Sequence, residues 1–584
     1  MKKIGFFVFL FLSAITLSAQ DYLAKNEYFY SLINGLDILV VQDSSAHEVS
    51  LGIAFHTGAF NKEKTYDGFT FIYQRIISER MKSAMPEFAT DSVFRIHSEP
   101  FYEYIMVRLS FPGKHLDKVL ESLYKSVSTE PFTASEIDDA LAFSNSELQK
   151  RASDTLFSIE QKMETSLWED DYQRRTVITA WNDSTARFVP ARLQKLKSDY
   201  FCPRNGLLVA KSSMIQKSVY EKVKAAFLNW ERCTTNPFTR FPAPNYRTAL
   251  QSTQLVDENP LTQTPFFRVA FPGPNTFEDL KSNFCAMVLA SLIESPESKI
   301  NRLLTDSCHL FKASLHNDLA KFISQITFEF TPEAGHLADG YECFRSFILQ
   351  KHDSVLDEQE LALAKEHLIS SFRSVQSKGD EHVSQIVKYW ACVTVNDYST
   401  FADSVNAITL SDMKKTFENY FLKRKYAAAL SIEPGMRASS GIDSAFTPTS
   451  VSLNDYRINF LKNSAKLAGA SNDSVLNSVI QYAKINPDVV IKVNGICHKD
   501  ELLEITDKEM LQWVRSLEGF IMNPPSFISK KKFRLDVYRS LTIIRKMMEE
   551  GIEKKRLFGT GNLVRTPGEP EKYQYVHFKE VLVN

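Results

Sequence analysis

Residues that could bind a metal ion are dispersed along this chain. The nearest approach to a ligand cluster is His498, followed by Asp500 and Glu501 in what the surrounding sequence predicts to be a loop. An imidazole and two carboxylates can hold a divalent cation when the backbone brings them together. Such a group more often forms solvated polar surface, and none of the twelve histidines belongs to an H-E-x-x-H sequence. The residues therefore predict no bound metal and no other cofactor.

Nucleophilic catalysis has no stronger support. A serine hydrolase of the α/β type would carry G-x-S-x-G, which this sequence lacks. Cys308 and His309 are adjacent, and neighbouring residues rarely point at each other, so we interpret them as structural, as we do Cys202. The seven cysteines are isolated and include no C-x-x-C pair. One or two disulfides could form in an oxidising compartment, but single buried cysteines are the interpretation that we favour.

The N-terminus has the pattern of a secretory signal peptide. Two lysines precede an apolar run from residue 4 to residue 17, and the small residues Ser18 and Ala19 follow it. The run is shorter than the ~20 residues that a transmembrane helix needs. We predict that residues 1–19 are removed on export and that no later segment spans a membrane. The expected location is the periplasm, or the periphery of the outer membrane of a Gram-negative bacterium.

The remaining chain has the composition of a protein with several hydrophobic cores. Its residues are 44% hydrophobic, and the formal net charge is −1. Without a basic excess, nothing favours nucleic acid as a partner. At about 100 to 200 residues per domain, the length predicts three or four domains.

The hydrophobic pattern predicts two tandem α+β repeats, 20–248 and 249–434. In the first, two strands precede a helix, a strand, two more helices and a closing strand, and the expected ranges are 36–41, 49–56, 69–81, 104–111, 116–128, 134–150 and 206–210. The second gives the same kinds of elements in the same order, with expected ranges 266–271, 277–294, 323–330, 358–375 and 427–432. A polar segment, 435–455, reads as a linker. Alternating strands and helices then predict a small α/β domain at 456–584.

The first repeat resembles the insulinase/pitrilysin family of zinc peptidases. Members of that family embed an inverted zinc motif as G-x-x-H-x-x-E-H, on a helix that follows a hairpin opened by N-G-L. Here Asn34-Gly35-Leu36 opens the hairpin, and Gly68 is followed by Phe71, Gln74 and Arg75 at the motif positions. A phenyl ring has no lone pair for zinc, a guanidinium has no acceptor, and a neutral amide cannot take a proton from water.

One residue of the expected zinc site remains. Glu147, in the sequence S-E-L-Q-K, matches the third ligand of the family. If the family fold holds, Arg75 and Glu147 lie on neighbouring helices, where an unpaired buried carboxylate would be costly. We therefore predict an ion pair between them. The alternative is that Glu147 is simply solvated on the helix surface.

The resemblance extends through the second repeat, to about residue 435. Pro272-Gly273-Pro274 and the Y-F-x-P-x-N pattern at Tyr200 both match the family, and Arg302-Leu303 matches its S-R-L turn. The Gly-rich stretch and the R-G-L-x-Y sequence that grips substrate in active members are absent. The resemblance thus implies that catalysis and the grip on the substrate backbone were lost together.

The last domain resembles the OmpA-like peptidoglycan-binding family. The strand leading to Gly495 and the G-x-G at Gly559 and Gly561 follow its pattern, and Arg539 matches the arginine that holds the diaminopimelate of the cell wall. The family's aspartate has no exact match, and Asp500 is the nearest candidate. Arg539 as an ordinary cation on the helix surface is the alternative.

Together these resemblances imply a non-catalytic envelope protein that uses a degenerate zinc-peptidase fold for protein interaction and is tethered towards the cell wall. The implied partner is a zinc-bearing homologue or an outer-membrane assembly. Three alternatives remain open at this point. The chain could be an active zinc-type metallopeptidase, a peptide-binding subunit paired with an active homologue, or a purely structural wall linker.

Overall fold

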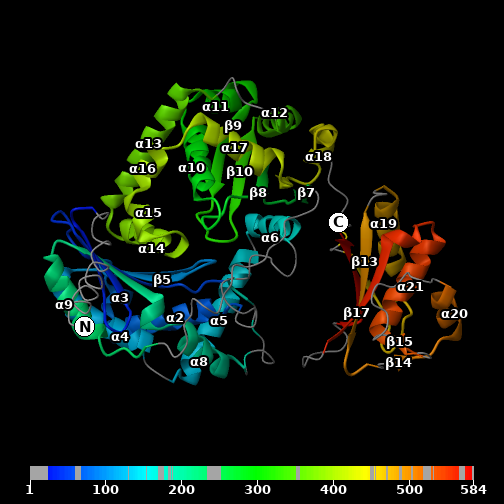
Figure 1. Cartoon of the computed structure of the whole chain (residues 1–584), viewed down its shortest axis with the longest axis horizontal. Coiled ribbons are helices and arrows are strands. Elements are labelled where there is room, and N and C mark those ends of the chain that lie inside the picture. Colours follow the sequence, from blue (N-terminus) through cyan, green and yellow to red (C-terminus); the bar gives the residue numbers. More distant parts are fainter. Residues whose placement is uncertain are drawn as a thin grey trace, which may run out of the picture. The chain divides into compact units, whose positions relative to one another are not determined.

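A computed structural model describes most of the chain. The described residues are 24–59, 67–128, 131–152, 154–168, 177–179, 181, 186, 188–232, 252–333, 335–349, 356–446, 453, 456–468, 471–485, 489–501, 504–516, 528–529, 532–564 and 573–581. They form two compact units that divide after residue 447 (Figure 1). The predicted signal peptide, 1–19, lies outside the described residues. Among those described, no helix has the length and apolar character that crossing a membrane requires.

A six-stranded mixed sheet organises the first repeat. Its strand order is β1-β2-β6-β3-β5-β4, and all neighbours are antiparallel except β2 and β6. The turn into β2 depends on Asn34 and Gly35. Gly35 has φ +95°, which suits glycine, while the Asn34 side chain donates to the carbonyl of Phe227 at 2.8 Å. The strands are β1 (Glu27–Ser31), β2 (Asp37–Gln42), β3 (Val49–Phe55), β4 (Arg95–Pro100), β5 (Ile105–Phe111) and β6 (Gly206–Ser212).

The second repeat contains a five-stranded sheet of the same design. Its order, β7-β11-β8-β10-β9, equals that of the first sheet without β1, and its closing strand is again parallel to its first one. The two sequence repeats therefore fold with one topology. The strands are β7 (Thr253–Glu258), β8 (Phe266–Pro272), β9 (Leu310–Asn317), β10 (Gln325–Pro332) and β11 (Ala427–Ile432).

Helices follow the strands in matching order in the two repeats. Those of the first are α2 (Phe69–Ala84), α3 (Glu87–Thr90), α4 (Leu116–Ser128), α5 (Ala134–Ala152), α6 (Thr155–Leu167), α8 (Val189–Tyr200) and α9 (Gln216–Phe227). Those of the second are α10 (Leu280–Glu294), α11 (Lys299–Arg302), α12 (Leu337–Leu349), α13 (Glu358–Gln376), α14 (Gly379–Cys392), α15 (Val395–Ser399), α16 (Phe401–Asn406) and α17 (Leu410–Phe417).

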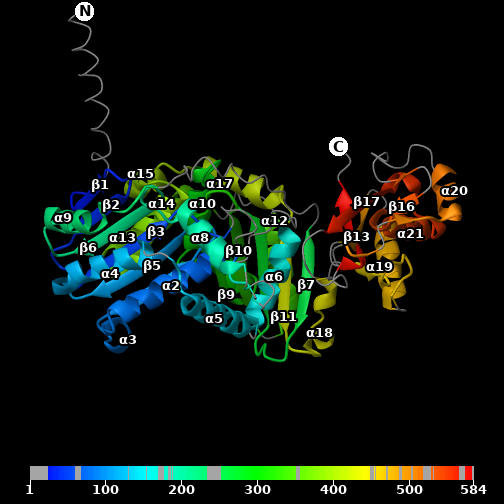
Figure 2. The same ribbon diagram turned by 90° about the horizontal axis from the view of Figure 1, so that it is seen from below.

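Each repeat packs one helix against the sheet of the other. Helix α14 of the second repeat lies on β3, β5 and β6 of the first, as Figure 1 shows. Helix α6 of the first repeat lies beside β7 and β11 of the second (Figure 2). Ile159 and Met163 of α6 pack there on the small side chains of Ala427 and Ala429. Because of this exchange, the two repeats form a single folded body.

The segment that we predicted to be a linker is folded as far as residue 446. It forms α18 (Met436–Ser439) and a short 3-10 turn (Ile442–Ser444). Ile442 and Phe446 are fully buried, and Phe446 packs on Phe267 and Tyr341. Two apolar residues in a polar segment are sufficient to anchor it, so the prediction of a linker beginning at 435 was wrong.

The second unit contains a four-stranded mixed sheet of order β12-β18-β13-β17, covered by α21. Glycine permits close contact between this helix and the sheet. A Cβ on Gly495 would lie 1.8 Å from the Asp536 carbonyl oxygen, and one on Gly561 would lie 2.7 Å from the Asp536 carboxylate. The elements are β12 (Arg457–Asn459), α19 (Ser471–Ile485), β13 (Val490–His498), β14 (Glu504–Ile505), α20 (Lys508–Ser516), β15 (Ile528–Ser529), β16 (Lys532–Arg534), α21 (Leu535–Glu549), β17 (Leu557–Val564) and β18 (Tyr575–Val581). The predicted α+β fold class is confirmed.

Candidate functional site

Helix α2 carries the three positions at which the resemblance predicted a degenerate zinc site. It begins after Gly68, whose φ of +80° allows the chain to turn into the helix. Residues 71 and 75 are four apart and share a helix face, while Gln74 lies beside that face. Phe71 and Arg75 are half-buried, and Gln74 is 1% exposed.

An aromatic and cationic stack occupies the face of α2 that bears Phe71 and Arg75. The Phe71 ring stacks on Phe143 of α5, with centroids 5.9 Å apart and planes at 11°. The Arg75 guanidinium carbon lies 3.8 Å from the centre of the same Phe143 ring. Such cation–π contacts contribute about 0.5 to 2 kcal/mol. Helices α2 and α5 therefore do meet at the predicted place, but through groups that cannot coordinate a metal.

The predicted ion pair between Arg75 and Glu147 is wrong. Arg75 binds Glu79 one turn along its own helix, at 3.0 Å, and Glu147 binds Lys150 at 2.5 Å. In the described part of the chain, Glu79 is the acidic partner of Arg75, and Lys150 is the basic partner of Glu147. Local i,i+4 and i,i+3 partners form at little entropic cost, and Phe143 already covers the guanidinium face. Glu147 is retained on α5, with 26% of its side chain exposed.

Gln74 has a structural role at the position where the peptidase base would stand. Its Nε2 donates a 2.7 Å hydrogen bond to the carbonyl of Met106 in β5. A neutral amide in this role ties the helix to the sheet and offers no basic group to water. The three motif positions of the first repeat therefore pack α2 against α5 and tie it to the sheet.

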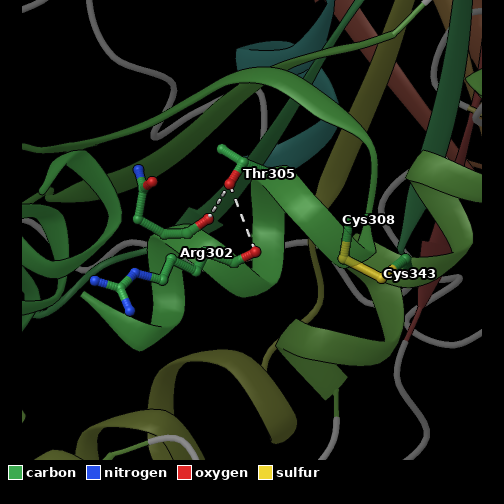
Figure 3. The surroundings of a disulfide bond; sticks show 5 residues. Arg302, Thr305, Cys308 and Cys343 are labelled. Carbon is green, nitrogen blue, oxygen red and sulfur yellow. Dashed lines mark hydrogen bonds between the residues drawn. A yellow bond between two sulfur atoms is a disulfide. The ribbon is translucent and has the colours of Figure 1, made fainter. Parts of the chain in front are cut away.

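In the second repeat, the region around the predicted S-R-L turn is fixed by a disulfide that we did not predict. Arg302 ends α11, and the Thr305 hydroxyl donates to the carbonyl of Asn301 at 3.0 Å. Cys308 and Cys343 are bonded to each other, as Figure 3 shows. Treating these two cysteines as single buried thiols was therefore wrong, because residues 35 positions apart meet only in the tertiary structure.

Arg539 is buried in the second unit and has no exposed surface. All five of its N–H groups are used within the chain. Two of them bind the Glu501 carboxylate in bidentate fashion, at 2.6 and 3.0 Å. The other three donate to the carbonyls of Ile496, Ser464 and Leu461 at 2.8, 3.0 and 3.3 Å. Arg539 is not a surface cation, and it has no donor left for a ligand.

Asp500, the predicted wall-binding aspartate, is not the partner of Arg539. It is 58% exposed at the side chain and lies 3.2 Å from His498 Nδ1. His498 ends β13 with no exposed surface, and the next carboxylate, Glu501, turns inward to the arginine. The expectation of a solvated surface loop was therefore wrong for His498 and Glu501.

A buried carboxylate that sequence reasoning missed joins the two repeats. Glu103, in the β4–β5 turn, accepts hydrogen bonds from the backbone N–H groups of Lys321 at 2.6 Å and Phe322 at 2.9 Å, in the β9–β10 turn. Burial raises the pKa of Glu103 to about 7, although these N–H groups and the Cys392 thiol lower it. Its sequence context is an ordinary turn between two strands, and only the fold reveals its role.

The sequence matches no protein-family model and no curated protein, but several solved structures have a similar fold. A protease from Helicobacter pylori is 14% identical with a TM-score of 0.58, covering 70% of this chain and all of its own. A protein of Alicyclobacillus acidocaldarius described as an M16-like peptidase is 12% identical with a TM-score of 0.59, covering 70% of this chain and 98% of its own. The chain has an M16-like peptidase fold.

This finding supports the insulinase-like fold inferred from the motifs. The first half of the periplasmic protease PqqL from Escherichia coli has the same fold, with 12% identity and a TM-score of 0.56, over 72% of this chain and 95% of its own. At such identities the comparison establishes the fold alone.

Proposed function

We propose that this protein is a non-catalytic binding protein of the bacterial envelope that has reused an M16-like peptidase fold. The observation that carries the proposal is the stack of Phe71, Phe143 and Arg75. It fills the helix face that would have to present two histidines, and Gln74 is engaged with Met106 instead of being free to act on water. A peptidase of this class needs a coordinated metal and a basic group to activate water. These residues provide neither.

The fold is also compatible with a role in assembly. A chain of Complex III2 from Candida albicans shares it, with 11% identity, a TM-score of 0.54 and coverage of 69% of this chain, so the fold is not restricted to proteins named as proteases. We propose that the two-repeat unit binds a protein partner, either a zinc-bearing homologue or an outer-membrane assembly. Affinity purification of the native protein from crosslinked envelopes tests this part, and a recurrent partner is the expected result.

A peptide-hydrolysis assay with metal analysis tests the absence of catalysis. The mature protein should not cleave unstructured peptides above background, and Glu147→Ala should change nothing. Glu121→Ala, at a solvent-exposed glutamate of α4, is the matched control. Turnover that is abolished by Glu147→Ala but not by Glu121→Ala would overturn the proposal in favour of an active metallopeptidase.

We also propose that the second unit holds the protein at the cell wall. Because every N–H group of Arg539 is bonded within the chain, recognition of the wall must use other groups of this unit or exchange Glu501 for a ligand carboxylate. The mature protein should co-sediment with purified peptidoglycan. If exchange at Arg539 operates, excess free diaminopimelate should release the protein. A protein that stays in the supernatant would contradict the tether.

A further inference from the structure

Two histidines and a glutamate meet at one end of the second sheet. His309 directly precedes β9, Glu333 directly follows β10, and His336 directly precedes α12. One ligand atom from each side chain lies within 4.8 Å of the others, and His309 Nδ1 is 3.6 Å from Glu333 Oε2. The two imidazole rings are stacked, with centroids 4.2 Å apart. The ends of three elements thus present three metal-binding side chains to one point.

The backbone fixes this arrangement. The Glu333 N–H donates to the His309 carbonyl at 2.8 Å, and the His336 N–H donates to the Glu333 carbonyl at 3.0 Å. The disulfide between Cys308 and Cys343 joins the residue before His309 to α12, the helix that follows His336. The histidines are therefore held near each other by a covalent bond in addition to the sheet.

One ring nitrogen in the cluster lacks a partner. Among the described residues, the buried His336 Nδ1 finds no hydrogen-bond partner, and the nearest carboxylate, that of Asp339, is 3.9 Å away. A buried polar atom without a hydrogen-bond partner is unfavourable, because it has lost its contact with water. Binding of a cation held by Glu333 and His309 would give this ring nitrogen of His336 a defined partner.

We propose that His309, Glu333 and His336 form a surface site for zinc or a closely related divalent transition metal. Two imidazoles and one carboxylate are the protein ligands of open zinc sites, whose fourth position is taken by water or by another ligand. In a tetrahedral site with bonds of ~2.0 to 2.1 Å, neighbouring ligand atoms are about 3.3 Å apart. The 3.6 Å between His309 and Glu333 is close to this value. The three side chains are 44%, 50% and 41% exposed, so an ion can enter and the side chains can rotate to close on it.

Zinc titration of the metal-free mature protein, in competition with a chromophoric chelator, tests this site. One zinc per chain should bind, and His309→Ala and His336→Ala should each weaken binding at least tenfold. Glu333→Gln preserves the shape of the side chain but removes its charge, and it should also weaken zinc binding. Cobalt bound at the same site should give the visible absorption of a tetrahedral ion, which the His336→Ala variant should lack.

His316→Ala is the matched control. His316 lies on β9 and is 4.0 Å from Glu329, and within the described part of the chain no third ligand accompanies this pair. This variant should bind zinc as the wild type does, and so should Glu147→Ala, which distinguishes this site from any metal bound in the first repeat. Absence of binding, or equal weakening in His309→Ala and His316→Ala, would overturn the proposal.

Discussion

Gly52 of β3 faces Val383 of α14 with no room for a side chain between them. A Cβ on Gly52 would lie 2.6 Å from Val383 Cγ1, closer than Cβ atoms in folded proteins approach their non-bonded neighbours. This contact lies where the helix of the second repeat covers the sheet of the first. The close packing of α14 on β3 therefore requires glycine at this position.

Gly52→Ala should destabilise the first unit by about 1 to 3 kcal/mol, because a stiff valine side chain cannot move aside without shifting α14. Urea denaturation measures the loss. Combining it with Val383→Ala should recover part of it, since the second change makes space. Gly113→Ala is the control, because its nearest neighbour would be 3.7 Å away. Equal losses for Gly52→Ala and Gly113→Ala would show that the contact is unimportant.

Arg539→Ala and Glu501→Ala should each destabilise the second unit by about 3 to 5 kcal/mol, because each leaves a buried charge without its partner. Hydrogen exchange of the β13 and α21 amides in the full chain reports on this unit. Arg545→Ala, which removes an exposed ion pair with Glu549 on the same helix, should have little effect. Unchanged protection in Arg539→Ala would contradict the structural role that we assign to this arginine.

Stability should fall as the pH rises from about 4.5 to about 7, through Glu103. The folded protein keeps the Glu103 proton up to about pH 7, whereas the unfolded chain releases it near 4.5, so the folded state binds more protons in this window. The resulting loss in the free energy of unfolding is on the order of 3 kcal/mol, and it is complete above pH 7. Urea denaturation at several pH values tests it.

Glu103→Gln should remove this part of the pH dependence, because glutamine does not titrate. Glu294→Gln, at an exposed position of α10, should retain it. If Glu103→Gln and the wild type showed the same slope between pH 4.5 and 7, the carboxylate would have to be ionised throughout.

Removal of the disulfide by Cys308→Ser with Cys343→Ser should cost about 4 kcal/mol, from the entropy of closing a loop of this length in the unfolded chain. The two cysteines are 35 residues apart. Thermal unfolding of the wild type and the double variant, both without a reducing agent, measures the effect of this one bond. A loss below 1 kcal/mol would show that the loop is already ordered in the unfolded state.

The sequence by itself predicted many of the elements, the order of the two α+β repeats and the unsuitability of Phe71, Gln74 and Arg75 as metal ligands or base, but it missed the strands β1, β4, β7 and β9. Hydrophobic periodicity is a local property, and so is the chemistry of a side chain, so both can be read without coordinates. The predicted helix 69–81 and the strands near 104–111 and 206–210 lie within α2, β5 and β6 to within a few residues.

Only the tertiary structure decided which charged groups meet. The choice between Asp500 and Glu501 as partner of Arg539 depends on the turn after β13, which points one carboxylate outward and the next inward. Glu103 and the N–H groups that it accepts from are more than 200 residues apart in the sequence. His309 lies beside His336 because the start of β9 lies next to the start of α12 and a disulfide joins the two elements. Such encounters depend on chain topology and packing, because residues distant in sequence have no local pattern in common.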